Sequence, residues 1–119
     1  MLLKIIRLFF KKDGTAQAIA MHRLIETLAK KNKRVISDSY AHNFVFGGSL
    51  FKLIGYKLNT FILKIIVPGL HEHLIARTKY LDEIVENNVK NGFKQYVILA
   101  AGYDSRAYRL KLPSDLKIF

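Results

Sequence analysis

The residues best suited to chemistry lie between positions 95 and 110. An apolar run over 96–101 is followed by Gly102 and then by Asp104 and Ser105, whose side chains can cap a helix. A run without polar alternation is typical of a strand buried on both faces of a parallel sheet, and the capping residues predict a helical turn after it. Strand, small-residue turn and helix start form the first half of a nucleotide-binding βαβ unit, in which a ligand approaches the turn and the helix N-terminus.

The glycine pattern of this turn is weak by itself. The three-glycine dinucleotide fingerprint is absent, since Ala100 and Gly102 stand where two of its glycines would be. Many strand-to-helix turns contain one glycine, so the spacing alone fits an ordinary α/β turn as well as it fits a cofactor site.

Four ordered patches of sequence are more specific than the glycine spacing. The turn, Leu99-Ala-Ala-Gly-Tyr-Asp-Ser-Arg-Ala-Tyr-Arg-Leu110, closely resembles the first motif of the leucine carboxyl methyltransferase-like family, Leu-Gly-Ala-Gly-x-Asp-Ser/Thr-Arg-x-Tyr/Trp-Arg-Leu, with Ala100 in place of the first glycine. The similarity covers about residues 15 to 119. The other patches are Ala76-Arg77-Thr78, Asp38-Ser39-Tyr40-Ala41, and Thr15-Ala16 with Arg23 and Glu26.

The resemblance implies an S-adenosylmethionine-dependent methyltransferase with a Rossmann-like α/β fold of class I, and S-adenosyl-L-methionine as its cofactor. It implies that Arg77 holds the cofactor carboxylate, which a planar guanidinium fits through two parallel hydrogen bonds. The implied reaction is methyl transfer in one displacement to an oxygen of a carboxyl or hydroxyl acceptor. The implied contacts to the amino-acid or ribose part of the cofactor come from the turn, through Ala100, Ala101, Gly102, Tyr103 and Asp104.

Without the resemblance, the same side chains have simpler roles. Arg77 lies between apolar positions of a predicted helix and fits a snorkelling surface residue. Asp104 can act as a helix cap only, and Arg106 and Arg109 could face solvent.

No other constellation predicts a reaction. His71 and His73 are two apart on a predicted helix and point in different directions, so we expect no metal site. No Ser/His/Asp arrangement or paired carboxylate stands out, and no catalytic residue is predicted. This agrees with methyl transfer, in which the cofactor carries the reactive group and the protein positions it.

Composition leaves one rival function open. The chain has 119 residues, no cysteine and a net charge of +11. The lack of cysteine is compatible with the cytoplasmic location that we expect. The charge fits a basic, non-catalytic module that binds a membrane surface or nucleic acid. However, residues 1–69 hold twelve Lys/Arg against three Asp/Glu, and residues 70–119 hold eight against six, so the excess is not focused beside the turn. We therefore expect a small-molecule acceptor, and no nucleic acid, as the partner.

Helices are predicted upstream of the turn. Residues 1–12 carry one apolar and one basic stripe, typical of a helix that packs on its own domain or lies on a membrane surface. Further helices are predicted over 16–31 and 70–91. Residues 50–67 predict one or two amphipathic helices rather than a membrane span, because three lysines interrupt the apolar run. The resemblance implies that these helices form a lid over the substrate. Leu53, Tyr56, Thr60, Leu63 and Val67 are predicted to lie near one side of these helices. Core packing is expected for Tyr40, Phe44 and Phe46.

We divide the chain into a helical cap or lid, residues 1–92, and the start of the cofactor-binding domain, residues 93–119. Residues 116–119 resemble the beginning of a second strand. The acidic residue that binds ribose hydroxyls about 20 positions past the glycine turn would fall just beyond Phe119. One strand and the start of another cannot cover a buried parallel strand. We therefore expect the N-terminal portion of a larger methyltransferase, inactive alone and prone to self-association.

Overall fold

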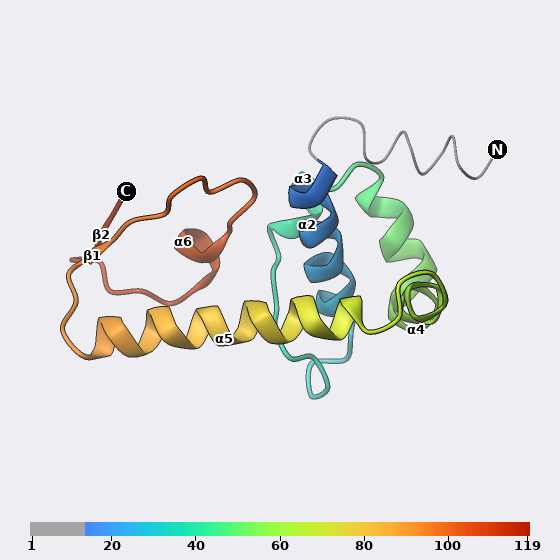
Figure 1. Ribbon diagram of the computed structural model, residues 1–119, viewed down its shortest axis with the longest axis horizontal. Helices are drawn as coiled ribbons and strands as arrows, with labels where there is room; N and C mark the ends of the chain where they lie inside the picture. The colour runs from blue at the N-terminus through green and yellow to red at the C-terminus, as the bar shows by residue number, and fades with distance from the viewer. Residues whose placement is uncertain (1–13) are drawn as a thin grey trace.

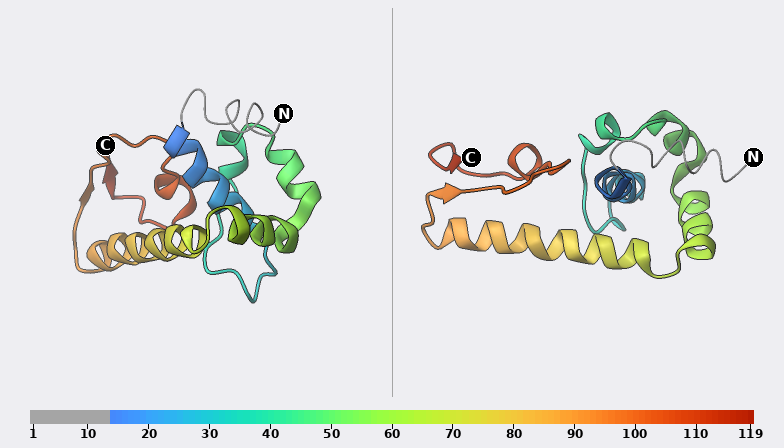
Figure 2. Two further views of the ribbon diagram at one scale, coloured as in Figure 1. Left: turned by 45° about the vertical axis from the view of Figure 1, so that its right-hand side comes forward. Right: turned by 45° about the horizontal axis from the view of Figure 1, so that its top comes forward.

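A computed structural model describes residues 14–119, and helices dominate it (Figure 1). The longest helix, α5, runs along one side of the molecule. Helices α2, α3 and α4 gather at its N-terminal end, whereas α6 and the two strands lie along its C-terminal half (Figures 1 and 2). The predicted helix over residues 1–12 lies outside the described residues. In chain order the elements are α2 (Gly14–Thr27), α3 (Ala41–Phe44), α4 (Gly48–Ile66), α5 (Leu70–Lys90), β1 (Gln95–Tyr96), α6 (Arg106–Arg109) and β2 (Lys117–Ile118).

Helix α2 is shorter at its C-terminal end than the predicted 16–31. It ends at Thr27, whose hydroxyl donates to the Arg23 carbonyl at 2.8 Å and accepts the Asp38 backbone N–H at 2.8 Å. The carboxylate of Glu26 accepts the backbone N–H of Val35 at 2.7 Å. These bonds turn the chain back along α2, so tertiary contacts end the helix before its apolar pattern does.

Helix α4 confirms the prediction of one or two amphipathic helices, because it is interrupted at Gly55 by an extended conformation with φ of +78°. Leu63 is buried and Thr60 is half-buried, as predicted. The prediction for Leu53 is wrong, since this residue is 84% exposed. The break at Gly55 rotates the first half of α4 relative to the second and removes Leu53 from the shared side. No helix among residues 14–119 has the length and apolarity needed to cross a membrane.

Helix α5 confirms the predicted helix over 70–91 and ends before Gly92, where φ is +95°. Its fully buried face is not formed by its large apolar residues, since Leu74 and Leu81 are only half-buried and Ile84 is exposed. Polar partners from other segments decide which side faces inward. The buried residues are His71, Ile75, Thr78 and Asp82.

The two strands pair in parallel, with Gln95 opposite Lys117, and the pairing continues through the backbone bond from Ile98 N–H to the Phe119 carbonyl at 2.9 Å. The second predicted strand is thus confirmed. The first is shorter than predicted and is not buried on both faces, since Val97 is 56% and Leu99 is 86% exposed. A two-stranded sheet leaves these side chains uncovered. The fold is mostly helical with a small parallel sheet, which is compatible with part of an α/β methyltransferase.

The apolar core lies where α2, α3 and α4 meet. Phe44 packs against it as predicted, and its ring stacks on that of Tyr103 with centroids 5.0 Å apart. The expected core role is wrong for Phe46, which is 65% exposed, and for Tyr40, which lies at the surface beside the ring of Tyr108. The stacked pair ties the predicted cofactor turn to the helices. The central residues of the core are Ala20, Leu24, Ala41 and Val45.

Candidate cofactor site

A pocket of about 360 Å³ opens between α2, α5 and the turn that follows β1. Side chains from the beginning of α2, including Ala16 and Ile19, form one wall, and Leu74 and Leu81 of α5 form another. The two helices and the turn are distant in sequence, so only the tertiary structure could bring them together. All six residues predicted to contact a cofactor line this pocket: Arg77, Ala100, Ala101, Gly102, Tyr103 and Asp104.

The turn places two residues in the left-handed backbone region. Gly102 has φ of +53°, and Ala100 has φ of +49°, which is uncommon for a residue with a Cβ atom. A Cβ atom on Gly102 would meet the Cβ of Ala16 at 3.6 Å, an ordinary contact. The positive φ, rather than a lack of space, is therefore why position 102 favours glycine. Position 100 has the same requirement, although alanine occupies it.

Arg77 differs from the other two cations that line the pocket. Arg23 and Arg106 are each ion-paired with aspartates, whereas Arg77 is exposed and has no carboxylate within 4.0 Å in the part of the chain that the structure describes. Its guanidinium therefore keeps its donors for a ligand. A planar fork of this kind binds a carboxylate through two parallel hydrogen bonds.

Asp38 anchors the turn to the helical part of the molecule. Its carboxylate lies 2.9 Å from Nε of Arg23 and accepts a hydrogen bond of 2.5 Å from the hydroxyl of Ser105. The other carboxylate oxygen accepts the backbone N–H groups of Tyr40 and Ala41 at 3.0 and 3.1 Å. Asp38 is 1% exposed, so every one of these contacts is shielded from water.

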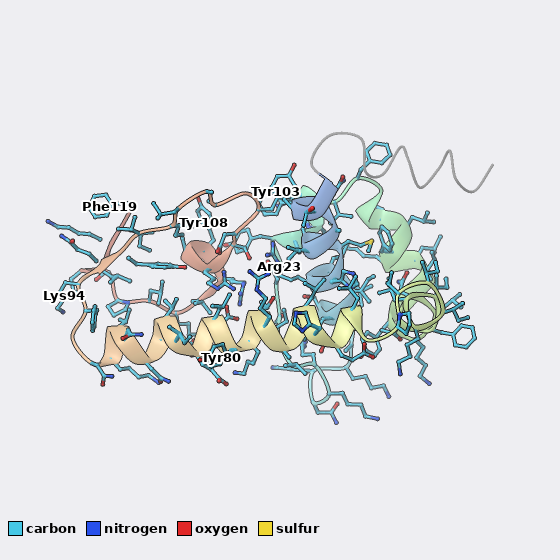
Figure 3. The ribbon with its side chains drawn as sticks, in the orientation of Figure 1. Arg23, Tyr80, Lys94, Tyr103, Tyr108 and Phe119 are labelled. Atoms are coloured by element: carbon cyan, nitrogen blue, oxygen red, sulfur yellow. The ribbon has the colours of Figure 1, made fainter. Side chains whose placement is uncertain are left out.

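Arg23 makes the most direct link from α2 to the turn. Its terminal Nη2 donates to the backbone carbonyl of Tyr103, and Figure 3 shows the side chain reaching from α2 in that direction. Burial lowers the pKa of Arg23, and the opposing effect of Asp38 only partly offsets it. This pairing supports the ionised guanidinium against the cost of its burial. Arg23 therefore positions the backbone of the turn while lining the pocket.

Asp82 of α5 holds the helix that follows the turn. Arg109 donates two bonds of 2.6 Å to its carboxylate, and Nε of Arg106 donates a third at 2.9 Å. Of the alternatives left open for these two arginines, exposure to solvent is wrong, since the side chain of Arg109 is 6% exposed and that of Arg106 is 12% exposed. Asp82 was missed because its signal lies only in its spacing from Ile75 and Thr78, which share the buried face of α5.

Asp104 combines the capping role and the position beside the pocket that were predicted as alternatives. One carboxylate oxygen accepts the backbone N–H of Arg106 at 2.8 Å, and the other accepts Nη1 of the same residue at 2.5 Å. Burial opposes the charge of Arg106, but Asp104 and Asp82 outweigh it and raise its pKa. Three buried or half-buried arginines thus face three aspartates, and the network is electrically balanced beneath the pocket.

A second buried polar cluster lies outside this pocket. Nδ1 of His22 is 3.0 Å from Nδ1 of His71, whose Nε2 is 3.3 Å from the Glu26 carboxylate. The Glu26 carboxylate accepts a hydrogen bond from Nε2–H of His71, and a neutral His71 then accepts a bond from His22 through Nδ1. Burial and the neighbouring His71 lower the pKa of His22 to about 4. No group of three His, Cys, Asp or Glu residues within positions 14–119 is arranged to hold a metal ion.

Comparison with known proteins identifies the type of chain. Residues 16–119 match the leucine carboxyl methyltransferase family. A Mycobacterium tuberculosis protein provisionally named an S-adenosyl-L-methionine-dependent methyltransferase is 40% identical over 112 residues, which cover 89% of this chain and 36% of that protein. A protein of the same provisional name from Mycobacteroides abscessus is 38% identical over 106 residues, covering 88% of this chain and 33% of that protein.

The matches are partial in length. A further protein of this provisional name, from Mycobacterium bovis, is 32% identical over 112 residues, or 88% of this chain and 35% of its own length. The chain thus spans about a third of the length of the curated relatives it matches. No solved structure matches it significantly.

Proposed function

Because the chain belongs to the leucine carboxyl methyltransferase family, we propose that it binds S-adenosyl-L-methionine in the pocket between α2, α5 and the turn after β1. The observation that carries the proposal is the position of Arg77. An arginine without a carboxylate partner among residues 14–119 lies beside a small-residue turn, in a pocket whose other two cations are already neutralised.

Each lining residue has a role in this proposal. The guanidinium of Arg77 holds the carboxylate of the cofactor by two parallel hydrogen bonds. The backbone from Ala100 to Gly102 lies against its amino-acid or ribose part, where small side chains permit close approach. Tyr103 supplies one side of the pocket, and Asp104 contributes the carboxylate lone pairs that its bonds with Arg106 leave free.

Methyl transfer needs little acid–base chemistry from this part of the chain. S-adenosyl-L-methionine supplies an activated methyl group when bound, and the pocket residues orient it and exclude water. Asp104 is the one carboxylate among the described lining residues, and Arg106 occupies both of its oxygens. A hydroxyl acceptor needs a general base to remove its proton, and Asp104 is a poor one. A carboxyl acceptor is already ionised at neutral pH, so these residues support a carboxyl acceptor over a hydroxyl one.

We also propose that residues 1–119, taken by themselves, transfer no methyl group. The support comes from the sheet, in which β2 is the one strand that pairs with β1 among residues 14–119, and Val97 and Leu99 are exposed. Exposed apolar strand faces and edges favour self-association.

The direct test is a calorimetric titration with S-adenosyl-L-methionine. Arg77→Lys keeps the charge but removes the planar fork, so we expect affinity to fall at least about tenfold, or about 1.4 kcal/mol. Arg34→Lys is the matched control, because the guanidinium of Arg34 donates to the exposed hydroxyl of Ser37, outside the pocket. Equal affinity of the Arg77→Lys variant and the unmodified protein would remove the carboxylate role.

A further inference from the structure

The second half of α4 exposes a continuous apolar stripe. Leu63 and Asn59 on its inner side are buried, whereas the outer side carries large apolar residues at three- and four-residue steps. Such spacing places them along one face of the helix. The outer residues, with their exposed fractions, are Leu58 (53%), Phe61 (61%), Ile62 (39%), Ile65 (67%) and Ile66 (61%).

This stripe is independent of the candidate cofactor site. No residue of α4 lines that pocket, and α4 lies at the opposite end of the molecule from β1 and β2 (Figures 1 and 2). The stripe is also held in a defined orientation. The side-chain amide of Asn59 donates to the carbonyls of Phe51 and Gly55 at 2.8 Å each, which fixes the break between the two halves of α4.

The charges on α4 are all positive. Lys52, Lys57 and Lys64 lie in the helix, and its sequence contains no aspartate or glutamate. Lys57 and Lys64 are seven residues apart, so they flank the same edge of the apolar stripe. Lys64 is 4.0 Å from Glu72, but both side chains are more than half exposed, and such a pair neutralises little. An apolar stripe bordered by lysines is typical of a helix that lies in the interface of an anionic membrane.

The same charges argue against two other occupants. A second copy of this face would bring four lysines together, Lys57 and Lys64 from each copy, and α4 offers no acidic side chain to separate them. A span across the bilayer is also excluded, because no described helix is long and apolar enough. Anionic lipid supplies both an apolar layer and complementary charge.

We propose that α4 docks this protein onto an anionic lipid surface. The rings and branched chains of Phe61 and Ile65 enter the boundary between headgroups and acyl chains, and Lys57 and Lys64 lie at the level of the lipid phosphates. Docking through α4 uses none of the residues that line the cofactor pocket. The proposal does not depend on methyl transfer.

The test is a binding assay with sonicated lipid vesicles, in which the bound protein is measured by co-sedimentation. Vesicles of phosphatidylcholine alone are compared with vesicles that contain about 30% phosphatidylglycerol. We expect at least about tenfold tighter binding to the anionic vesicles, weakening as salt is added. Equal binding to both vesicle types, or binding to neither, would overturn the proposal.

Two variants locate the contact, each with a matched control. Phe61→Gln is compared with Tyr80→Gln on α5, since the two rings are 61% and 63% exposed. Lys57→Glu is compared with Lys111→Glu, an exposed lysine after α6. We expect the α4 variants to lose at least about tenfold in vesicle affinity and the controls to change less than about twofold.

The remaining outcomes discriminate among rival occupants. If Lys57→Glu and Lys111→Glu weaken binding equally, general basic charge rather than α4 is responsible, and the proposal fails. If light scattering shows a dimer that Phe61→Gln dissociates, without any vesicle binding, a second copy covers the stripe instead. Circular dichroism checks that each variant retains its helices.

Discussion

Ser105 and Asp38 are 67 residues apart in the chain, yet their side chains share a hydrogen bond of 2.5 Å and are each 1% exposed. The bond joins the turn after β1 to the segment that leads into α3. The same carboxylate is paired with Arg23, which holds the carbonyl of Tyr103. The position of the candidate cofactor turn therefore depends on a buried charge contributed by a distant loop.

The first prediction concerns this anchor. Asp38→Asn keeps the size of the side chain but removes its charge and leaves Arg23 buried without its partner, so we expect a loss of about 3 kcal/mol in the free energy of unfolding. Ser105→Ala removes one hydrogen bond and should cost about 1–2 kcal/mol. Urea denaturation measures both, with the exposed Ser114→Ala as the unchanged control. A smaller effect for Asp38→Asn than for Ser105→Ala would contradict the anchoring role.

The second prediction compares two neighbouring acidic residues of α5. Asp82→Ala should destabilise the protein by at least about 3 kcal/mol, because Arg106 and Arg109 lose their shared buried carboxylate. Glu83→Ala removes only an exposed pair with Lys79 and should change stability by about 0.5 kcal/mol or less. Thermal and urea unfolding of the two variants measure the difference. Similar stabilities would show that the network beneath the turn contributes little.

The third prediction concerns the backbone of the turn at Ala100. Glycine there relieves a left-handed conformation that costs about 1–2 kcal/mol with a Cβ atom, against about 0.4–1 kcal/mol of added chain entropy in the unfolded state. Ala100→Gly should therefore be neutral or stabilising by up to about 1.5 kcal/mol. The same substitution at Ala107, within α6, should destabilise by about 0.5–1 kcal/mol. An equal loss of stability at both positions would contradict a strained backbone at Ala100.

The fourth prediction concerns Gly102. Gly102→Val forces a β-branched residue into a positive φ and adds methyl groups beside Ala16, at the edge of the pocket. We expect cofactor binding to be lost while the helical circular dichroism signal from α2, α4 and α5 is retained. Asparagine tolerates this backbone conformation better than valine does, so Gly102→Asn separates the effect of backbone strain from that of side-chain size. Retained binding by the valine variant would mean that the turn is only structural.

The fifth prediction concerns acid stability and His22. Its pKa is lowered by burial, and further by His71, from 6.5 to about 4 in the folded protein. The unfolded chain therefore binds more protons between these values, so the stability contributed by the neutral residue is lost as pH falls from about 6.5 toward about 4. The full loss is on the order of 3 kcal/mol.

Urea titrations across that pH range test this prediction against a variant. His22→Asn keeps a donor toward His71 but cannot titrate, so the pH dependence between about 6.5 and 4 should flatten. His73→Asn, on the exposed side of α5, should retain the slope of the unmodified protein. Identical slopes in all three proteins would assign the acid sensitivity to other groups.

Features that depend on neighbouring residues could be predicted from local patterns in the sequence. The apolar spacing of residues 70–91 was sufficient to predict α5, and the small-residue turn around Gly102 could be identified from the motif. The family could likewise be predicted from the sequence, because its motifs are local patterns of residues that do not depend on the segments they contact in space. Local backbone preference and side-chain periodicity extend over only a few residues, and that is the range of these predictions.

The tertiary structure alone decided which charges meet and which apolar faces are covered. From the sequence, Arg106 and Arg109 could equally be surface residues. In the structure, α5 brings Asp82 into contact with them, although it lies 24 and 27 positions away in the chain. The break at Gly55 moved Leu53 to the surface, and the two-stranded sheet left Leu99 exposed. A buried ion pair is stable only when packing removes both partners from water together, so its existence depends on segments that no local pattern connects.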